Sequence, residues 1–329
     1  MKNFKTAFDT LLGKIESREN FAFTRFSDGE LFIMQNKTVV LADNHYVTGD
    51  IRGSNRYTKE EHKEFYPEKH QFYREKLIEC YKHNQDGYYK GICTSTDGHV
   101  GKQNFDWMID FHGGDHDNLT FSNLLINANY SRFIEELVPS LGNREIIYIV
   151  NELADTNMLP FNISKKFLIG SNCMIGNYDT SEKVKEYIKD NNIVDAIILC
   201  SAASLSNFII YECFKANPNN TFLDIGSCLN PLLGLEGWKY TRGYLTGYWM
   251  DSGSPFAGRF IGYTGVIEND IRIAVNPVHH GKGVGKFMIN EIMKNNPHAF
   301  AKVKLENNAS LRLFESCGFK RKYYIMERN

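Results

Sequence analysis

The sequence predicts an α/β protein with a mainly parallel sheet and flanking helices, followed by a small C-terminal α+β module. Hydrophobic residues make up 42% of the 329-residue chain, which is enough for a sizeable core. Short apolar runs rich in β-branched residues alternate with helical stretches, as buried parallel strands and their crossover helices do. Near residue 250 a small, polar segment interrupts this pattern, and a different one follows.

The elements of the larger part are expected in the following order. Residues 4–15 carry apolar side chains at helical spacing, and residues 21–26 alternate as a strand does. Residues 57–83, rich in Glu, Lys and aromatic residues, are predicted to be long helical surface interrupted at Pro67. Further strands are predicted at 88–93, 145–150, 166–169, 194–199 and 221–225, and helices at 102–110, 130–137, 181–191 and 205–216.

The segment 250–258 (MDSGSPFAG) is the best candidate for a linker, because its residues are mostly small and polar and Pro255 interrupts it. It predicts two domains, at residues 1–249 and 256–329. In the second domain we expect strands at 260–267, 271–275, 301–305 and 323–326, and helices at 286–294 and 309–317.

Charge and cysteine content exclude several classes of protein. The net charge is −1, from 38 Lys and Arg against 39 Asp and Glu, so no overall basic field favours nucleic acid as a partner. No apolar run approaches the ~20 residues of a membrane span, and the N-terminus lacks the apolar core of a signal peptide. Seven scattered cysteines without a CxxC pair fit reduced thiols. We therefore expect a cytoplasmic protein, with peripheral contact at the inner membrane face and homo-oligomerisation left open.

An acidic turn follows the first predicted strand. Asp28 and Glu30 flank Gly29, so both carboxylates can point to one place where the strand ends. Such a pair suits Mg²⁺ or Mn²⁺ carrying a diphosphate, because these ions accept few protein carboxylates together with phosphate oxygens. The alternative is an Asp-Gly turn followed by a glutamate at a helix start.

The motif RFSDGEL at 25–31 resembles the RFGDGE signature of bacterial GT-D-type glycosyltransferases, with Ser27 in place of the usual glycine. The resemblance continues in order over roughly residues 1–249. The segment 121–137 resembles a family helix that bears an arginine, here Arg132, and TFLDIGSC at 221–228 resembles the closing Asp-Ile-Gly strand. The loop Ser-Ala-Ala-Ser after Cys200 departs from the family's glycine-rich loop.

This resemblance implies a Rossmann-like fold and metal-dependent transfer of a sugar from a nucleotide sugar, with UDP expected. The acceptor would be a cell-surface glycan or a glycoprotein. Asp28 and Glu30 would bind Mn²⁺ or Mg²⁺ with the diphosphate. Arg25 and Arg132 are candidate phosphate partners, since a guanidinium matches phosphate bidentately, and ordinary ion pairs are the alternative. Asp224 is expected to be an acceptor-activating base or a ribose contact, or else a structural cap.

A glycine-rich loop precedes a predicted helix in the tail, where Gly281, Gly283 and Gly285 would let the backbone approach an anion. With the segment 306–319, it resembles the GNAT acyltransferase family, which binds acetyl-CoA on such a loop. His280 stands at the family's Gln/Arg position, and Asn307 matches the asparagine of the family's N-x-x-S stretch. Phe314 replaces a tyrosine that many members carry and that is thought to protonate the leaving thiolate. The tail is therefore expected to bind acetyl-CoA with little catalysis, to complete its site from the first domain, or to be a structural or oligomerising module.

Other interpretations stay open at this stage. The chain could be an acetyl-CoA-dependent N- or O-acetyltransferase, a bifunctional glycosyl- and acetyltransferase, or a sugar-nucleotide sensor without catalysis. The segment 110–117, with two His and three Asp, is either a metal chelate or a polar surface loop. The donor sugar, the acceptor and the stereochemistry at C1 are not specified by the sequence.

Overall fold

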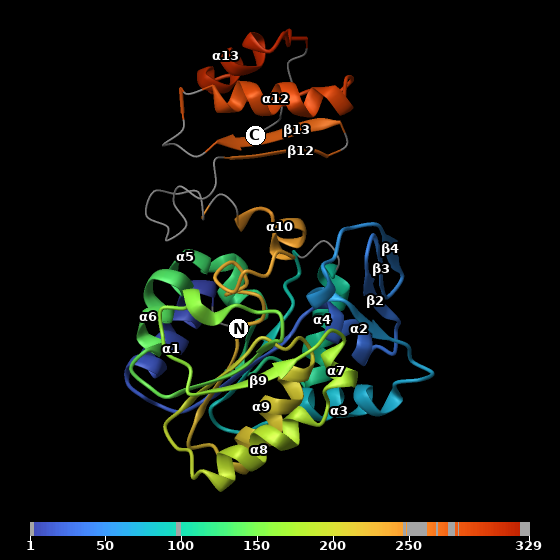
Figure 1. Ribbon diagram of the computed structural model, residues 1–329. Coiled ribbons are helices and arrows are strands. Elements are labelled where there is room, and N and C mark those ends of the chain that lie inside the picture. The colour runs from blue at the N-terminus through green and yellow to red at the C-terminus, as the bar shows by residue number, and fades with distance from the viewer. Residues whose placement is uncertain are drawn as a thin grey trace. The chain divides into compact units, whose positions relative to one another are not determined.

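The computed structural model describes residues 3–96, 100–245, 248, 262–267, 269–275, 280–281 and 283–322 (Figure 1). The chain divides into two compact units, Met1–Thr241 and Arg242–Asn329. The linker predicted at 250–258 and the strand predicted at 323–326 lie outside the described residues. In the described parts of the chain, no helix has the length and apolar character needed to cross a membrane.

The N-terminal unit is built on a seven-stranded sheet in which every neighbouring pair is parallel. This confirms the predicted parallel α/β sheet. The strand order is β7-β6-β1-β11-β10-β8-β9, so the first and last strands of the unit, β1 and β11, are neighbours. Their bounds are β1 Ala22–Phe26, β6 Tyr88–Ile92, β7 Leu119–Phe121, β8 Ile146–Asn151, β9 Lys165–Ile169, β10 Ile197–Cys200 and β11 Thr221–Asp224.

Helices cover both faces of this sheet, which explains why β8, β10 and β11 are buried along their whole length. Helices α1 (Phe4–Glu16), α5 (Tyr130–Arg132) and α6 (Val138–Leu141) lie on one face, and α3 (Gln71–Lys82), α8 (Thr180–Asp190) and α9 (Leu205–Ala216) on the other (Figure 1). The remaining elements are α2 Asp28–Met34, α4 Gly101–His112, α7 Cys173–Gly176, α10 Trp238–Thr241, the 3-10 turns η1 Lys59–Glu61 and η4 Thr156–Met158, and the π-helical turns η2 Leu124–Ala128 and η3 Phe133–Leu137.

A second, antiparallel sheet lies between α2 and α3 in the sequence. Its order is β4-β3-β2-β5, with β2 Val39–Ala42, β3 His45–Thr48, β4 Ile51–Gly53 and β5 Lys63–Phe65. The long helical surface predicted at 57–83 is therefore wrong before residue 71. The cause is tertiary: β5 forms by pairing with β2, where Phe65 lies opposite Val39, and Phe65 is buried.

The C-terminal unit has two antiparallel strands and two helices: β12 Gly262–Ile267, β13 Asp270–Val275, α12 Val284–Asn295 and α13 Asn308–Ser316. Ile271, Ile289 and Phe314 form its buried core. The strand predicted at 301–305 is wrong: these residues form no strand in the structure, and the residue before them, Phe300, makes an isolated bridge with Asp270. The other predicted strands and helices of the described tail are confirmed.

Candidate functional site

The acidic turn lies where β1 ends, at the edge of the sheet at which parallel α/β proteins place their ligands. Glu30 is only 5% exposed. One of its carboxylate oxygens accepts a hydrogen bond from the Ser27 backbone N–H at 2.9 Å and closes a capping box at the start of α2. The other accepts the hydroxyl hydrogen of Ser204, in the loop after β10. Both oxygens of Glu30 are therefore held inside the protein.

Asp28 differs from Glu30 in being half-buried and little restrained. One of its oxygens accepts the Gly29 backbone N–H at 2.9 Å, and no cation lies within ion-pair distance of it in the described parts of the chain. Tyr57 lies close by: burial raises the pKa of its hydroxyl, and the charges of Glu61 and Asp28 contribute to that rise. Asp28 is thus the acid of the pair that is available to a ligand.

A buried ion pair joins the ends of β1 and β11. Arg25 Nη2 lies 3.2 Å from Asp224 Oδ1, and their side chains are 12% and 3% exposed. The Ser122 carbonyl accepts a hydrogen bond from Arg25 Nη1, and Asp224 accepts one from the Gly226 backbone N–H at 3.0 Å. A Cβ on Gly226 would stand 1.9 Å from Arg25 Nη2, so the guanidinium packs directly on this glycine.

The electrostatics of this pair follow from its burial. Burial raises the pKa of Asp224 to about 6, although the Arg25 guanidinium acts in the opposite direction. Burial disfavours the charged form of Arg25, yet the Asp224 carboxylate and other nearby groups raise the pKa of Arg25 overall. At neutral pH both groups are therefore charged. Arg25 Nε is buried and has no hydrogen-bond partner within the described residues.

Arg132 is held by a different set of partners. It pairs with Asp9 of α1 at 2.8 Å and with Glu136 of η3 at 2.6 Å, and its guanidinium covers the Phe8 ring. A hydrogen bond from Arg132 to Glu136 is the main cause that raises the pKa of this guanidinium. The structure thus gathers Arg25, Asp28, Glu30 and Asp224 in one region and gives Arg132 no contact with them.

Sequence reasoning missed two polar side chains at this site, Lys63 and Ser204. A Cβ on Gly29 would stand 2.8 Å from the Lys63 Nζ, so this amine lies against the turn between the two acids. Lys63 begins β5, a strand that exists through long-range pairing, and no local pattern could have placed it here. The unusual Ser-Ala-Ala-Ser loop was a visible signal for Ser204, since its hydroxyl binds Glu30.

The arrangement does not fit a divalent cation chelated by the two acids. Both oxygens of Glu30 are already engaged, which leaves Asp28 as the one acid of the pair with an unbonded oxygen. In the part of the chain that the structure describes, no three His, Cys, Asp or Glu side chains are grouped so as to hold a metal ion. This includes the segment 110–117, where burial lowers the pKa of His112 to about 4 and its ring contacts the Gly114 carbonyl.

The predicted acetyl-CoA loop is exposed in the C-terminal unit. Gly281 and Gly283 have left-handed φ angles of +73° and +82°, and a Cβ on either would meet no atom of the described residues within 4 Å. The open backbone before α12 agrees with an anion-binding loop. Gly285 differs, because its Cβ would stand 2.9 Å from Leu313 Cδ2, so this glycine allows α12 and α13 to pack. The His280 ring contacts the Val275 carbonyl at 2.8 Å.

Two further residues of the resemblance have structural roles in this unit. The Asn307 side chain accepts a hydrogen bond from the Ser310 backbone N–H at 3.1 Å, which caps α13. Phe314, at the position of the family's tyrosine, is buried in the small core. A phenyl ring has no proton to donate, so Phe314 cannot act as an acid.

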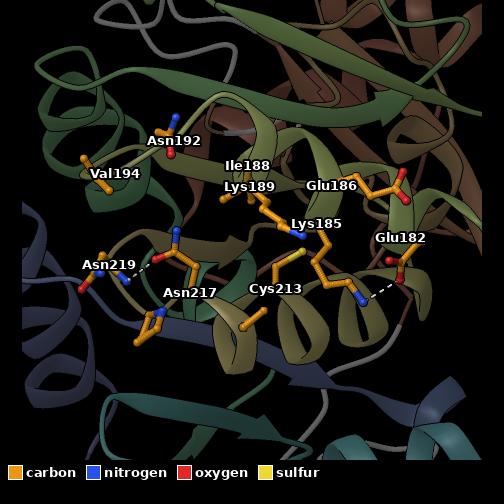
Figure 2. A pocket seen from close by; sticks show the side chains of 12 residues that line it. Glu182, Lys185, Glu186, Ile188, Lys189, Asn192, Val194, Cys213, Asn217 and Asn219 are labelled. Atoms are coloured by element: carbon orange, nitrogen blue, oxygen red, sulfur yellow. Dashed lines mark hydrogen bonds and ion pairs between the residues drawn. The ribbon is translucent and has the colours of Figure 1, made fainter.

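A separate groove of about 640 Å³ lies between α8 and α9 (Figure 2). Asn192 and Val194 line it just before β10, and Asn217 and Asn219 just before β11. The groove is therefore at the amino ends of these strands, at the opposite edge of the sheet from Asp28 and Asp224. It contains none of the predicted site residues.

Comparison with known proteins identifies two kinds of likeness. A family model described as an acetyltransferase (GNAT) domain matches residues 248–321. A solved structure titled a new glycosyltransferase (DUF1792) from Streptococcus sanguinis is 14% identical, with a TM-score of 0.47, over 74% of this chain and 84% of that chain. Another, titled as a domain of unknown function 1792 with a distinct glycosyltransferase fold, is 11% identical with a TM-score of 0.43, over 72% and 79%. A search of the curated proteins finds no match.

Proposed function

We propose that the N-terminal unit is a glycosyltransferase that takes a sugar from a nucleotide sugar, with a UDP-sugar as the expected donor, and passes it to a glycan or glycoprotein acceptor. One observation carries this proposal. Arg25, Asp28, Glu30 and Asp224, which the resemblance selects from distant parts of the sequence, gather where the adjacent parallel strands β1 and β11 end. Sites of α/β proteins lie at this edge.

The proposed roles follow from which atoms of each side chain are already bonded within the protein and which are available to a ligand. Asp28 contacts the substrate, because it is the carboxylate with an unbonded oxygen. Glu30 holds the turn, since it bonds Ser27 and Ser204. Asp224 is a positioning residue that fixes the Arg25 guanidinium through their ion pair. The transferred sugar leaves a nucleoside diphosphate behind, and fixed positive charge near that group stabilises the transition state.

A donor screen tests this function. The full chain is incubated with a panel of nucleotide sugars, with and without Mn²⁺, and released nucleoside diphosphate is measured by mass spectrometry. The Asp28→Asn variant should lose turnover by roughly 100-fold or more. Asp110→Asn, an exposed acid outside the site, is the matched control and should keep wild-type turnover. Absence of binding and turnover with every nucleotide sugar would exclude the proposal.

The C-terminal unit has its own candidate function, the binding of acetyl-CoA, which the family match at 248–321 and the open backbone at Gly281 and Gly283 favour. Calorimetry with acetyl-CoA tests it. A Gly283→Ala variant should bind more weakly, because φ is +82° there and a side chain strains the loop. If wild-type protein gives no heat at high acetyl-CoA concentration, this function is excluded. A bifunctional enzyme requires that both this test and the donor screen succeed.

A further inference from the structure

We propose that the Lys63 ammonium binds the diphosphate of the nucleotide sugar in the N-terminal unit and supplies there the positive charge that a divalent cation would otherwise bring. This inference rests on the proposed glycosyltransferase function. It concerns a residue that lies outside the RFSDGEL motif, in the antiparallel sheet formed by β2 to β5.

The backbone around Lys63 is fixed against the loop after β9. The His62 carbonyl accepts a hydrogen bond from the Asn172 N–H at 2.8 Å, and the Glu64 N–H donates one to the Asn172 side chain at 3.0 Å. The residues on both sides of Lys63 are thus bonded to the same asparagine. Asn172 itself has a left-handed φ of +51°, an unusual conformation that the surrounding contacts hold in place.

The absence of a side chain at Gly29 leaves room for the Lys63 amine. A Cβ there would lie 2.8 Å from Nζ and 3.7 Å from Cε, which is too close for any other residue unless the lysine moves. The glycine between the two acids therefore has a second role besides the turn. It lets a cation from β5 stand against the backbone between Asp28 and Glu30.

Among the residues that the structure describes, Lys63 is the site's cation without a protein partner. Arg25 is paired with Asp224, whereas the half-buried Lys63 side chain makes no ion pair or hydrogen bond within the described residues. Removing a charge from water without a partner is costly, and a bound anion offsets that cost. A lysine ammonium binds phosphate as a compact point charge. Since both oxygens of Glu30 are engaged, this amine is better placed than a chelated metal ion to neutralise a diphosphate.

Calorimetric titration of the full chain with UDP tests the proposal, in EDTA and in Mn²⁺. Wild-type protein should bind UDP equally well in both, and Lys63→Met should weaken binding by about tenfold or more, the range of a hydrogen bond to a charged group. Lys63→Arg should retain part of the affinity. Gly29→Ala should weaken binding as well, because its Cβ displaces Nζ. The control is Lys59→Met, an exposed lysine four residues away, which should bind as wild type does.

Two results would overturn the inference and separate it from the proposed function. If wild-type protein binds UDP only with Mn²⁺, and Lys63→Met behaves as wild type does, the site uses a metal ion and the function stands without this role for Lys63. If wild-type protein binds no UDP or other nucleotide in either buffer, both the function and the inference are wrong. Thermal melts of each variant show that a loss of binding is not a loss of folding.

Discussion

At the scale of single residues, the site depends on how its charged groups are divided between internal and external partners. Glu30 and Asp224 are held by the protein, and Asp28 and Lys63 are the charged groups left for a ligand. The sequence indicated Arg25, Asp28, Glu30 and Asp224 through one short motif and its downstream matches. It could not show which of them would be engaged internally, because Ser204 reaches Glu30, and Arg25 reaches Asp224, only through tertiary packing.

Gly226 gives the first prediction, since the Arg25 guanidinium packs on it. We expect Gly226→Ala to displace that guanidinium, break the ion pair with Asp224, and lower the free energy of unfolding by roughly 1–3 kcal/mol as overpacking does. Donor turnover should fall with it. Chemical denaturation and the donor assay measure the two effects.

Gly234→Ala is the matched control for this variant. Gly234 also has a left-handed φ, of +69°, but a Cβ there meets no atom within 4 Å. Gly234→Ala should therefore lower the free energy of unfolding only by the cost of the left-handed backbone conformation, about 1 kcal/mol, and should retain turnover. If the two variants behave alike, the contact between Gly226 and Arg25 has no special importance.

Asp224 gives a prediction about pH. Its pKa is raised from the ordinary 3.8 to about 6, so the folded state holds a proton that the unfolded state has released between these values. The contribution of this group to stability is therefore complete below pH 3.8 and is lost as the pH rises through about 6. We expect the unfolding free energy of wild type, relative to Asp224→Asn, to decrease over that interval. Denaturation of both proteins from pH 4 to 7 measures it, and a difference that rises with pH would contradict the raised pKa.

At the scale of elements, local pattern was sufficient where the apolar residues of an element follow a regular spacing over five or more residues. Helix α9 has its predicted bounds, and α1 and β1 differ from theirs by one residue at one end. Two predictions failed where the local pattern is short: β5, only three residues long, is a strand because it pairs with β2, and the tail segment 301–305 forms no strand within the described residues. Because Lys63 lies on β5, a strand that the sequence did not predict, this residue of the site was not predicted either.

Helix α13 gives a prediction about the role of Asn307 as its N-cap. The N-cap hydrogen bond of its side chain stabilises the helix by about 1 kcal/mol, so Asn307→Ala should lower the free energy of unfolding of the C-terminal unit by that amount. Asn307→Asp keeps the acceptor oxygen and should stay close to wild type. Thermal denaturation of the full chain compares the three proteins, and equal losses in both variants would show that Asn307 does not act as a cap.

At the scale of the whole molecule, the two units carry separate cores and separate candidate sites. The larger core packs around the parallel sheet, and the smaller one around Ile271, Ile289 and Phe314. From a change of pattern the sequence predicts two domains, at 1–249 and 256–329, and its two resemblances fall in separate parts of the chain. The fold class was therefore accessible from the sequence, whereas the partners of each charged side chain required the three-dimensional arrangement.

The central claim is that the carboxyl ends of β1 and β11 hold the diphosphate of a nucleotide sugar. A crystal structure of the full chain soaked with UDP tests it most directly. We expect diphosphate density beside Gly29, in contact with the Lys63 ammonium and within reach of Asp28. A nucleotide bound instead at the amino ends of the strands, in the groove between α8 and α9, would contradict it.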